Sequence, residues 1–92
     1  MIKRIVKLSI NIDKVGDFIS VFNENKDKIL CFDGCEHVEL WQDIEKPNII
    51  FTYSLWKNVQ SLNKYRDSDL FRSVWTNVKP FFHQKAVAWS LK

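Results

Sequence analysis

Apolar and polar residues alternate along the first segment of the chain. Within residues 2–12, Val6, Leu8 and Ile10 fall on one face of an extended backbone, and the intervening Lys7 falls on the other. A period of two is typical of a strand with one buried face. This segment is therefore predicted to be the first strand of a sheet.

Three further segments have the pattern of strands. Residues 35–43 alternate in the same way, and residues 49–56 form a run rich in β-branched and aromatic residues. Pro47 lies in the short polar stretch between them, which predicts a turn and joins the two segments as a hairpin. A last strand is predicted at residues 83–91.

The segment after the first strand has helical spacing. Residues 13–31 carry one apolar stripe among charged residues, which predicts an amphipathic helix with Asp13 as its N-cap. Gly34 supplies the positive φ that a helix stop or tight turn demands. The stripe comprises Val15, Phe18, Ile19, Phe22 and Ile29.

A second helical region follows the hairpin. Asn58 is predicted to cap it, residues 67–69 interrupt it, and Ser68 caps a further helix that Pro80 ends. The order β-α-β-β-α-β predicts an α+β, ferredoxin-like fold: a four-stranded antiparallel sheet with both helical segments on one face. We expect residues 1–92 to form a single domain.

The strand at residues 49–56 is apolar on both of its faces. Phe51 and Tyr53 fall on one face, while Ile50 and Trp56 fall on the other. Helices cover only one face of such a sheet, and a face in contact with water is normally polar. We therefore predict a homodimer in which two sheets face each other, which buries apolar surface at roughly 25 cal/mol per Å². The alternative is that one aromatic row forms an exposed platform for a ligand.

Composition narrows the class of protein. The net charge of +3 is small and the chain has no basic block, so no nucleic-acid partner is expected. Lys3, Arg4 and Lys7 are interpreted as solvated edge residues.

No apolar run approaches the roughly 20 residues that span a bilayer, and the N-terminus lacks the pattern of a secretory signal. We expect a soluble, cytoplasmic protein with no membrane partner.

A more specific pattern follows the third strand. The strand ends in Trp56, Asn-x-x-x-Leu occupies residues 58–62, and Tyr65 and the run Ser-Asp-Leu-Phe at residues 68–71 come next. Together with the order of elements, this resembles the antibiotic-biosynthesis-monooxygenase family of dimeric α/β barrels, along the whole chain. The resemblance implies a pocket in each subunit between the sheet and the helices. Some relatives oxidise aromatic polyketides there with molecular oxygen and no metal or flavin, and others degrade haem or act on signalling molecules or quinones.

The haem-degrading branch of this family differs from the chain at its functional positions. By the resemblance, its haem-ligating His would fall at Trp75, its pocket Trp at Tyr65, and its first-strand Asn near Val6. Iron would then lack an axial ligand, and His83 lies past the helix. Many other relatives carry a His at the position of Tyr65, so the tyrosine also weakens the expectation of general-base chemistry.

The polar candidates for catalysis are Tyr65, Arg66 and His37. Tyr65 lies on an apolar stripe, so its ring is expected to be buried and its hydroxyl to need a partner. Arg66 could hold an anionic or quinone oxygen, or lie on the surface. His37 could face the pocket or the dimer interface, or be structural. The expected wall of the substrate pocket comprises Trp56, Phe71, Trp75, Phe18 and Phe22.

The functional hypothesis is a cofactor-independent monooxygenase that acts on a small aromatic or quinol-type molecule. Cys31, Cys35 and His37 are three candidate metal ligands, and Cys35 and His37 are interpreted as sharing one strand face. A zinc site normally has a fourth ligand and firmer spacing, so no metal is expected, and no cofactor is expected either. One alternative is a non-catalytic, small-molecule-binding or regulatory dimer of the same fold. Another is an RNA-recognition domain, which shares the order of elements and stacks bases on sheet aromatics such as Phe51 and Tyr53.

Overall fold

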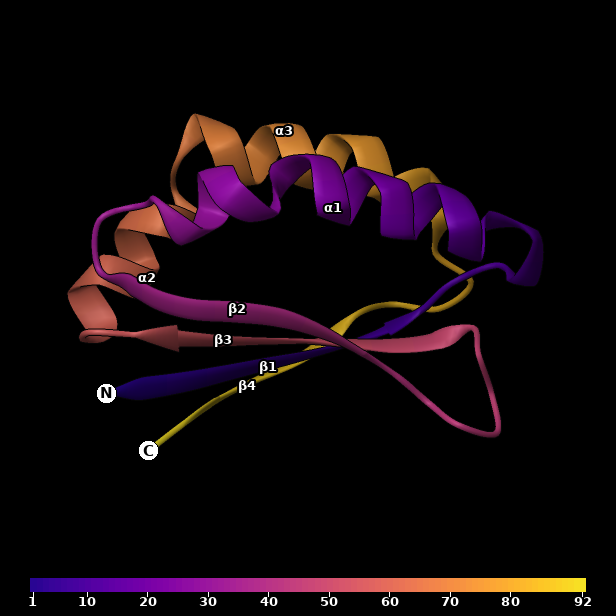
Figure 1. The fold of residues 1–92 in the computed structure, drawn as a ribbon, viewed down its shortest axis with the longest axis horizontal. Helices are drawn as coiled ribbons and strands as arrows, with labels where there is room; N and C mark the ends of the chain where they lie inside the picture. Colours follow the sequence, from indigo (N-terminus) through magenta and orange to yellow (C-terminus); the bar gives the residue numbers. More distant parts are fainter.

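The computed structural model describes residues 1–92 and has a four-stranded antiparallel sheet with all of its α-helices on one face (Figure 1). The strands are arranged in the order β2-β3-β1-β4. The predicted α+β, ferredoxin-like fold and its order of elements are confirmed. The elements are β1 (Ile2–Ser9), η1 (Ile12–Lys14), α1 (Val15–Leu30), β2 (Cys35–Gln42), β3 (Ile49–Trp56), α2 (Val59–Arg66), α3 (Asp69–Val78), η2 (Lys79–Phe81) and β4 (Val87–Leu91).

Two of the three predicted helix caps are present. The side chain of Asn58 accepts a hydrogen bond from the backbone N–H of Ser61, and that of Ser68 accepts one from Phe71. The prediction of Asp13 as a cap is wrong, because a 3₁₀ turn precedes α1 and places Lys14 at the cap position without a side-chain bond. This 3₁₀ turn leads directly into α1. The spacing of apolar residues alone does not distinguish such a turn from the first turn of an α-helix.

The first and last strands are shorter than predicted. β1 ends at Ser9, and Ile10 forms only an isolated bridge with Phe82. β4 begins at Val87, because the chain after η2 turns and its His83 N–H donates to the carbonyl of Ser9. None of the helices combines the length and the apolar character that a membrane-spanning segment requires.

The hydrophobic core lies between the sheet and the helices. Leu8 and Ile50 reach it from the two central strands, where they are directly paired, and Phe22 reaches it from α1. α1 packs on β2, and α3 packs on α1, so the first helix contacts both the sheet and the other long helix. The buried cluster comprises Leu8, Ile10, Phe18, Phe22, Ile29, Val38, Ile50 and Val78.

The other face of the sheet, here called the open face, has no element over it (Figure 1). Its central rows pair Tyr53 and Trp89 with Ile5, and Phe51 and Val87 with Lys7. Its large exposed apolar side chains include Trp41, Val87, Trp89 and Leu91, each between 42% and 47% exposed. The apolar surplus expected from alternation is therefore present on this face.

A bulge at the start of β2 changes which residues share a face. Cys35 pairs with Trp56, whereas His37 pairs with the adjacent Leu55, because the register shifts between Cys35 and His37. Directly paired residues lie on the same face. Cys35 therefore points toward the helices and His37 toward the open face, so the interpretation that they share one face is wrong.

Candidate functional site

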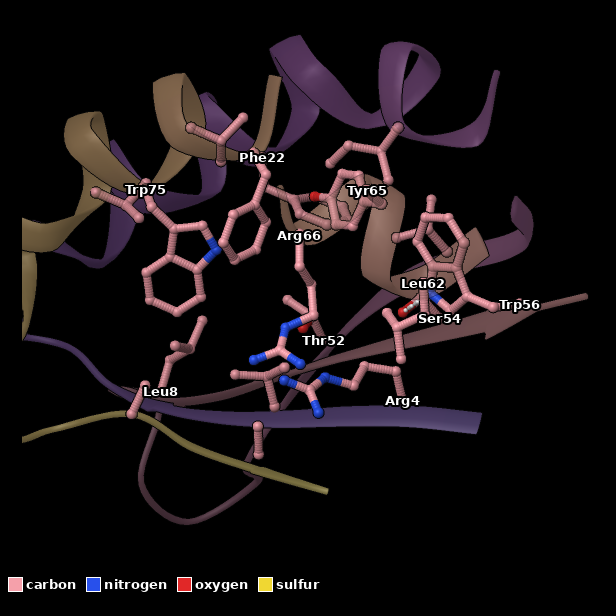
Figure 2. A pocket seen from close by; sticks show the side chains of 18 of the residues that line it. Arg4, Leu8, Phe22, Thr52, Ser54, Trp56, Leu62, Tyr65, Arg66 and Trp75 are labelled. Atoms are coloured by element: carbon pink, nitrogen blue, oxygen red, sulfur yellow. Dashed lines mark hydrogen bonds between the residues drawn. The ribbon is translucent and has the colours of Figure 1, made fainter. Parts of the chain in front are cut away.

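A pocket of about 450 Å³ lies between the sheet and the helices (Figure 2). Volumes of roughly 300–1,000 Å³ are typical of sites for small organic ligands. The lining is mainly apolar, and its polar members are few: Arg4, Thr52, Ser54, Tyr65, Arg66 and Lys79. No carboxylate and no imidazole is among the lining residues.

The pocket exists because the floor and the roof carry side chains of different size. Part of the floor uses small residues, Thr52 and Ser54 on β3 and Ala86 and Ala88 near and on β4. The roof carries bulky residues of α1, α2 and α3. A small side chain opposite a large one leaves space that neighbouring side chains do not fill.

Tyr65 is held by its aromatic neighbours. Its ring stacks on Trp56 at 4.8 Å between centroids and meets Phe32 and Phe71 edge-on at 5.4 and 5.2 Å. Trp56 is fully buried, and its indole N–H donates to the hydroxyl of Ser54 at 2.9 Å. Since its ring is already stacked and its N–H satisfied, Trp56 fixes the position of Tyr65 more than it offers a surface to a ligand.

Burial changes the acidity of Tyr65. Loss of hydration, with a smaller contribution from the nearby Cys35, raises the pKa of the Tyr65 phenol to about 12. The phenol is therefore neutral at physiological pH and available as a hydrogen-bond donor. Figure 2 shows the hydroxyl turned toward the interior of the pocket beside Phe22. Every buried polar side-chain atom has a hydrogen-bond partner, so the Tyr65 hydroxyl is not enclosed in the core without one.

Aromatic side chains continue along the helical side of the pocket. The ring centroids of Phe71 and Trp75 are 5.5 Å apart, and Trp75 meets Phe82 edge-on with 5.5 Å between centroids. Phe71 and Trp75 are half-buried, whereas Phe18 and Phe22 are buried at the roof. All five residues expected in the pocket wall line the cavity.

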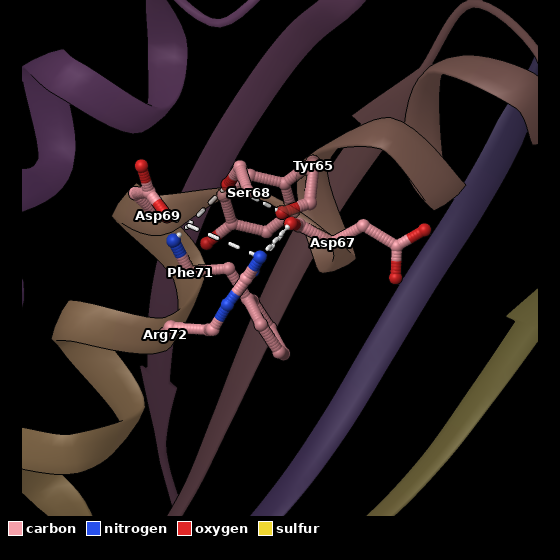
Figure 3. A network of polar contacts seen from close by, with 6 residues as sticks. All are labelled: Tyr65, Asp67, Ser68, Asp69, Phe71 and Arg72. Atoms are coloured by element: carbon pink, nitrogen blue, oxygen red, sulfur yellow. Dashed lines mark hydrogen bonds and ion pairs between the residues drawn. The ribbon is translucent and has the colours of Figure 1, made fainter.

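The turn between α2 and α3 sets the position of Tyr65 and Arg66 (Figure 3). Both terminal nitrogens of Arg72 donate to the backbone carbonyl of Asp67 at 2.6 Å. The hydroxyl of Ser68 donates to the carbonyl of Tyr65 at 2.6 Å and accepts from the N–H of Phe71 at 3.1 Å. The run Ser-Asp-Leu-Phe therefore closes one helix and starts the next, which directs Tyr65 into the pocket.

Arg66 lines the pocket, as does Arg4, which sequence reasoning assigned to the solvated edge. That assignment of Arg4 is wrong, because Arg4 is even-numbered like Val6 and Leu8 and therefore shares their helix-covered face. The hydroxyl of Ser90 accepts a hydrogen bond from Arg4 at 2.9 Å. Strand alternation was the signal that could have found it.

His37 does not reach the pocket. On the open face its Nε2 lies 2.8 Å from a carboxylate oxygen of Glu39, whose other oxygen accepts from the indole N–H of Trp41 at 2.6 Å. The hydrogen bonds from His37 and Trp41 lower the pKa of the Glu39 carboxyl. The second histidine, His83, is exposed after η2 and is also absent from the lining.

The residues do not fit the groups that other branches of such a fold use. Because neither histidine lines the pocket, the residues offer no imidazole to a haem iron. No three His, Cys, Asp or Glu side chains gather into a metal-binding group. Burial, its largest cause, raises the pKa of the Cys35 thiol, which disfavours the thiolate that a nucleophile or a metal ligand requires.

Comparison with known proteins identifies the family. Residues 1–75 match the family model described as antibiotic biosynthesis monooxygenase. The chain belongs to this family. The matched residues include all three helices down to Trp75, and therefore most of the pocket's roof. A comparison with curated proteins finds no significant match.

Solved structures share the fold of this family member. A conserved protein from Methanosarcina mazei Go1 superposes with a TM-score of 0.93 at 21% identity, covering 99% of this chain and 90% of that one. A candidate antibiotic biosynthesis monooxygenase from Nitrosomonas europaea gives 0.92 at 15% identity, covering 100% and 97%. Another from Bordetella bronchiseptica gives 0.90 at 20% identity, covering 99% and 94%. At these identities the similarity establishes the fold alone.

Proposed function

We propose that this family member is a cofactor-independent monooxygenase that oxidises a small aromatic or quinol-type molecule in the pocket between sheet and helices. The observation that carries the proposal is the aromatic, apolar pocket of about 450 Å³ into which the neutral hydroxyl of Tyr65 turns. Membership of the antibiotic biosynthesis monooxygenase family supports the same class of reaction.

The reaction needs little from the protein, because the substrate supplies the electrons. For an anthrone, the ring CH₂ reacts with O₂ to give a ring carbonyl and one water, so that R–CH₂–R′ + O₂ gives R–CO–R′ + H₂O. One oxygen atom enters the product, the other leaves in water, and all four electrons come from the carbon. The substrate must first lose a proton to form an enolate, whose negative oxygen the site stabilises.

Tyr65 acts in this proposal as the donor to the enolate oxygen. A phenol with a pKa of about 12 stays protonated at neutral pH and is a poor base, so the proton passes to solvent water. The positive charges of Arg4 and Arg66 favour the anion electrostatically in a site that is largely apolar. Trp56 keeps the Tyr65 ring in place by stacking.

Oxygen consumption with a panel of anthrones and hydroquinones tests the proposal. We expect uptake by the native chain, a loss of about ten-fold to a hundred-fold in kcat for Tyr65→Phe, and a smaller loss for Trp56→Phe. Tyr53→Phe removes the only other tyrosine hydroxyl, on the open face, and is the matched control. No uptake with any substrate, or equal uptake by native and Tyr65→Phe proteins, would contradict the proposal.

A second candidate is a non-catalytic domain that binds a small molecule. The observation favouring it is that the pocket contains no group that titrates near neutral pH, since its lining has neither carboxylate nor histidine. Binding of an anthrone, measured by quenching of tryptophan fluorescence, without oxygen uptake would select this candidate. Uptake that requires Tyr65 would exclude it.

We also propose that two chains pair through their open faces. The exposed apolar side chains of β2 and β4, with Phe51 and Tyr53 between them, form a surface that an identical sheet could cover. Association at roughly 25 cal/mol per Å² of buried apolar area would remove this surface from water. Light scattering should give the mass of a dimer at micromolar concentration, and the mass of one chain would refute the pairing.

A further inference from the structure

The pocket holds two cationic side chains from elements far apart in the sequence. Arg4 belongs to β1, and Arg66 is the last residue of α2. Both line the pocket, and Figure 2 shows their guanidinium groups next to each other above the sheet, near Thr52. Neither arginine takes part in an ion pair, since the molecule's ion pairs involve Lys14, His37 and Arg72.

The two arginines repel each other, and the pocket lining contains no acid that could pair with either of them. Burial first, and then the positive charge of Arg66, lowers the pKa of Arg4. Lys79 adds a third cation to a lining that contains no carboxylate. Arg4 is half-buried and Arg66 is exposed, and like charges held together without an anion repel one another.

The arrangement leaves donors free for a ligand. Of the five N–H groups of the Arg4 guanidinium, one is directed to the hydroxyl of Ser90. Guanidinium groups form two parallel hydrogen bonds with a carboxylate, which an ammonium group does not match. An anionic group between Arg4 and Arg66 would both accept these bonds and remove the repulsion between the arginines.

We propose that Arg4 and Arg66 together bind the carboxylate of a planar aromatic acid whose rings occupy the apolar part of the pocket. The inference rests on the proposed function in that it takes the pocket to be the site of a small aromatic molecule. A carboxylate is ionised at neutral pH without help from the protein, and the remaining lining suits fused rings. A mainly phosphate ligand would leave this aromatic lining without a partner.

A pair of matched probes tests the charge directly. Anthraquinone-2-carboxylate and its neutral amide, anthraquinone-2-carboxamide, have the same rings and nearly the same shape. Calorimetric titration of the full chain should show that the acid binds at least about ten-fold more tightly than the amide. Raising the salt concentration should weaken binding of the acid and leave binding of the amide nearly unchanged.

Variants then assign the effect to the two arginines. We expect Arg4→Gln and Arg66→Gln each to weaken binding of the acid by about ten-fold or more and to leave binding of the amide unchanged. Lys3→Gln and Lys64→Gln remove one charge from β1 and α2 outside the pocket lining, and should leave both affinities unchanged. Arg66→Lys should restore only part of the affinity for the acid.

The outcomes separate this inference from the proposed function. Equal affinity for acid and amide, or equal losses in the lysine controls, would overturn the inference and leave oxygenation of neutral quinols untouched. If Arg66→Gln weakened binding of the acid and of the amide equally, Arg66 would only support the end of α2. That result would also overturn the inference. Selective binding of the acid, together with no oxygen uptake from any anthrone or hydroquinone of the panel, would support the inference and contradict the monooxygenase. Binding of neither probe would count against both.

Discussion

The two faces of the sheet are made from similar residues but have different structures. Trp56 on the helix-covered face is fully buried, stacked on Tyr65 and hydrogen-bonded to Ser54. Trp89 on the open face is 43% exposed. The covered face therefore has its partner within the chain, whereas the open face has none. This difference places the pocket on the covered face and leaves the apolar surface of the open face for the pairing proposed above.

The polar residues of the two faces are also arranged differently. On the covered face, Arg4 and Arg66 share a pocket without an acid. On the open face, Glu39 accepts hydrogen bonds from His37 and Trp41, so its charge is already compensated. Compensated groups can be covered by a partner at lower cost, whereas uncompensated groups in a pocket attract a ligand of opposite charge.

The largest contrast should come from removing one tryptophan from each face. Trp56→Ala removes a fully buried ring and should lower the free energy of unfolding by about 3–5 kcal/mol. That loss should not depend on protein concentration, because the contacts lie within one chain. Trp89→Ala should cause a smaller loss that grows as the protein concentration rises into the range of the dimer. Urea unfolding at two protein concentrations measures both, and a concentration-independent loss for Trp89→Ala would contradict pairing through the open face.

A new charge on the open face should break association without unfolding the chain. Val87 is 47% exposed and pairs directly with Lys7, so Val87→Glu gains a favourable neighbour in the separate chain. In a dimer the same carboxylate would be buried, and we expect the dissociation constant to rise by about 30-fold to 100-fold, equivalent to about 2–3 kcal/mol. Analytical ultracentrifugation measures the change. Ser20→Glu on the exposed side of α1 is the control and should have no effect.

The buried phenol on the covered face predicts a loss of stability at high pH. The pKa of Tyr65 is about 12 in the folded chain and near 10 when unfolded, so the neutral form is favoured by folding. Its contribution is complete below pH 10 and is lost as the pH rises to 12, which amounts to about 2–3 kcal/mol. Unfolding measured between pH 9 and 12 should show this decline in the native chain. A decline of the same size in Tyr65→Phe would show that other groups cause it.

Some features of the fold follow directly from the sequence. The strand at residues 49–56 is β-prone throughout and ends at the residue predicted, and the caps Asn58 and Ser68 use short-range hydrogen bonds that their own side chains define. The positions of Leu8 and Ile50 in the core follow from alternation. Local preference and burial agree in all of these segments, which is why a single sequence is sufficient to predict them.

Other features depend on contacts that one segment does not encode. The bulge between Cys35 and His37 turns Cys35 toward the helices, while His37 stays on the open face with Glu39, and nothing in the local alternation marks the extra residue. The 3₁₀ turn before α1 similarly displaced the predicted cap at Asp13. The meeting of Arg4 and Arg66 requires the packing of α2 against β3, the neighbour of β1, because the residues are 62 positions apart.

The smallest effect should come from the compensated acid on the open face. The hydrogen bonds from His37, and then from Trp41, lower the pKa of Glu39 in the folded chain. A lowered pKa stabilises the fold above the unfolded value of the carboxyl, and that contribution is lost as the pH falls through the folded value.

NMR titration of the Glu39 carboxyl should therefore give a midpoint below that of an ordinary glutamate. The midpoint should rise in His37→Ala and, by less, in Trp41→Phe. If the midpoint stayed in place in both variants, the two hydrogen bonds would not compensate this charge, and the contrast between the polar groups of the two faces would fail.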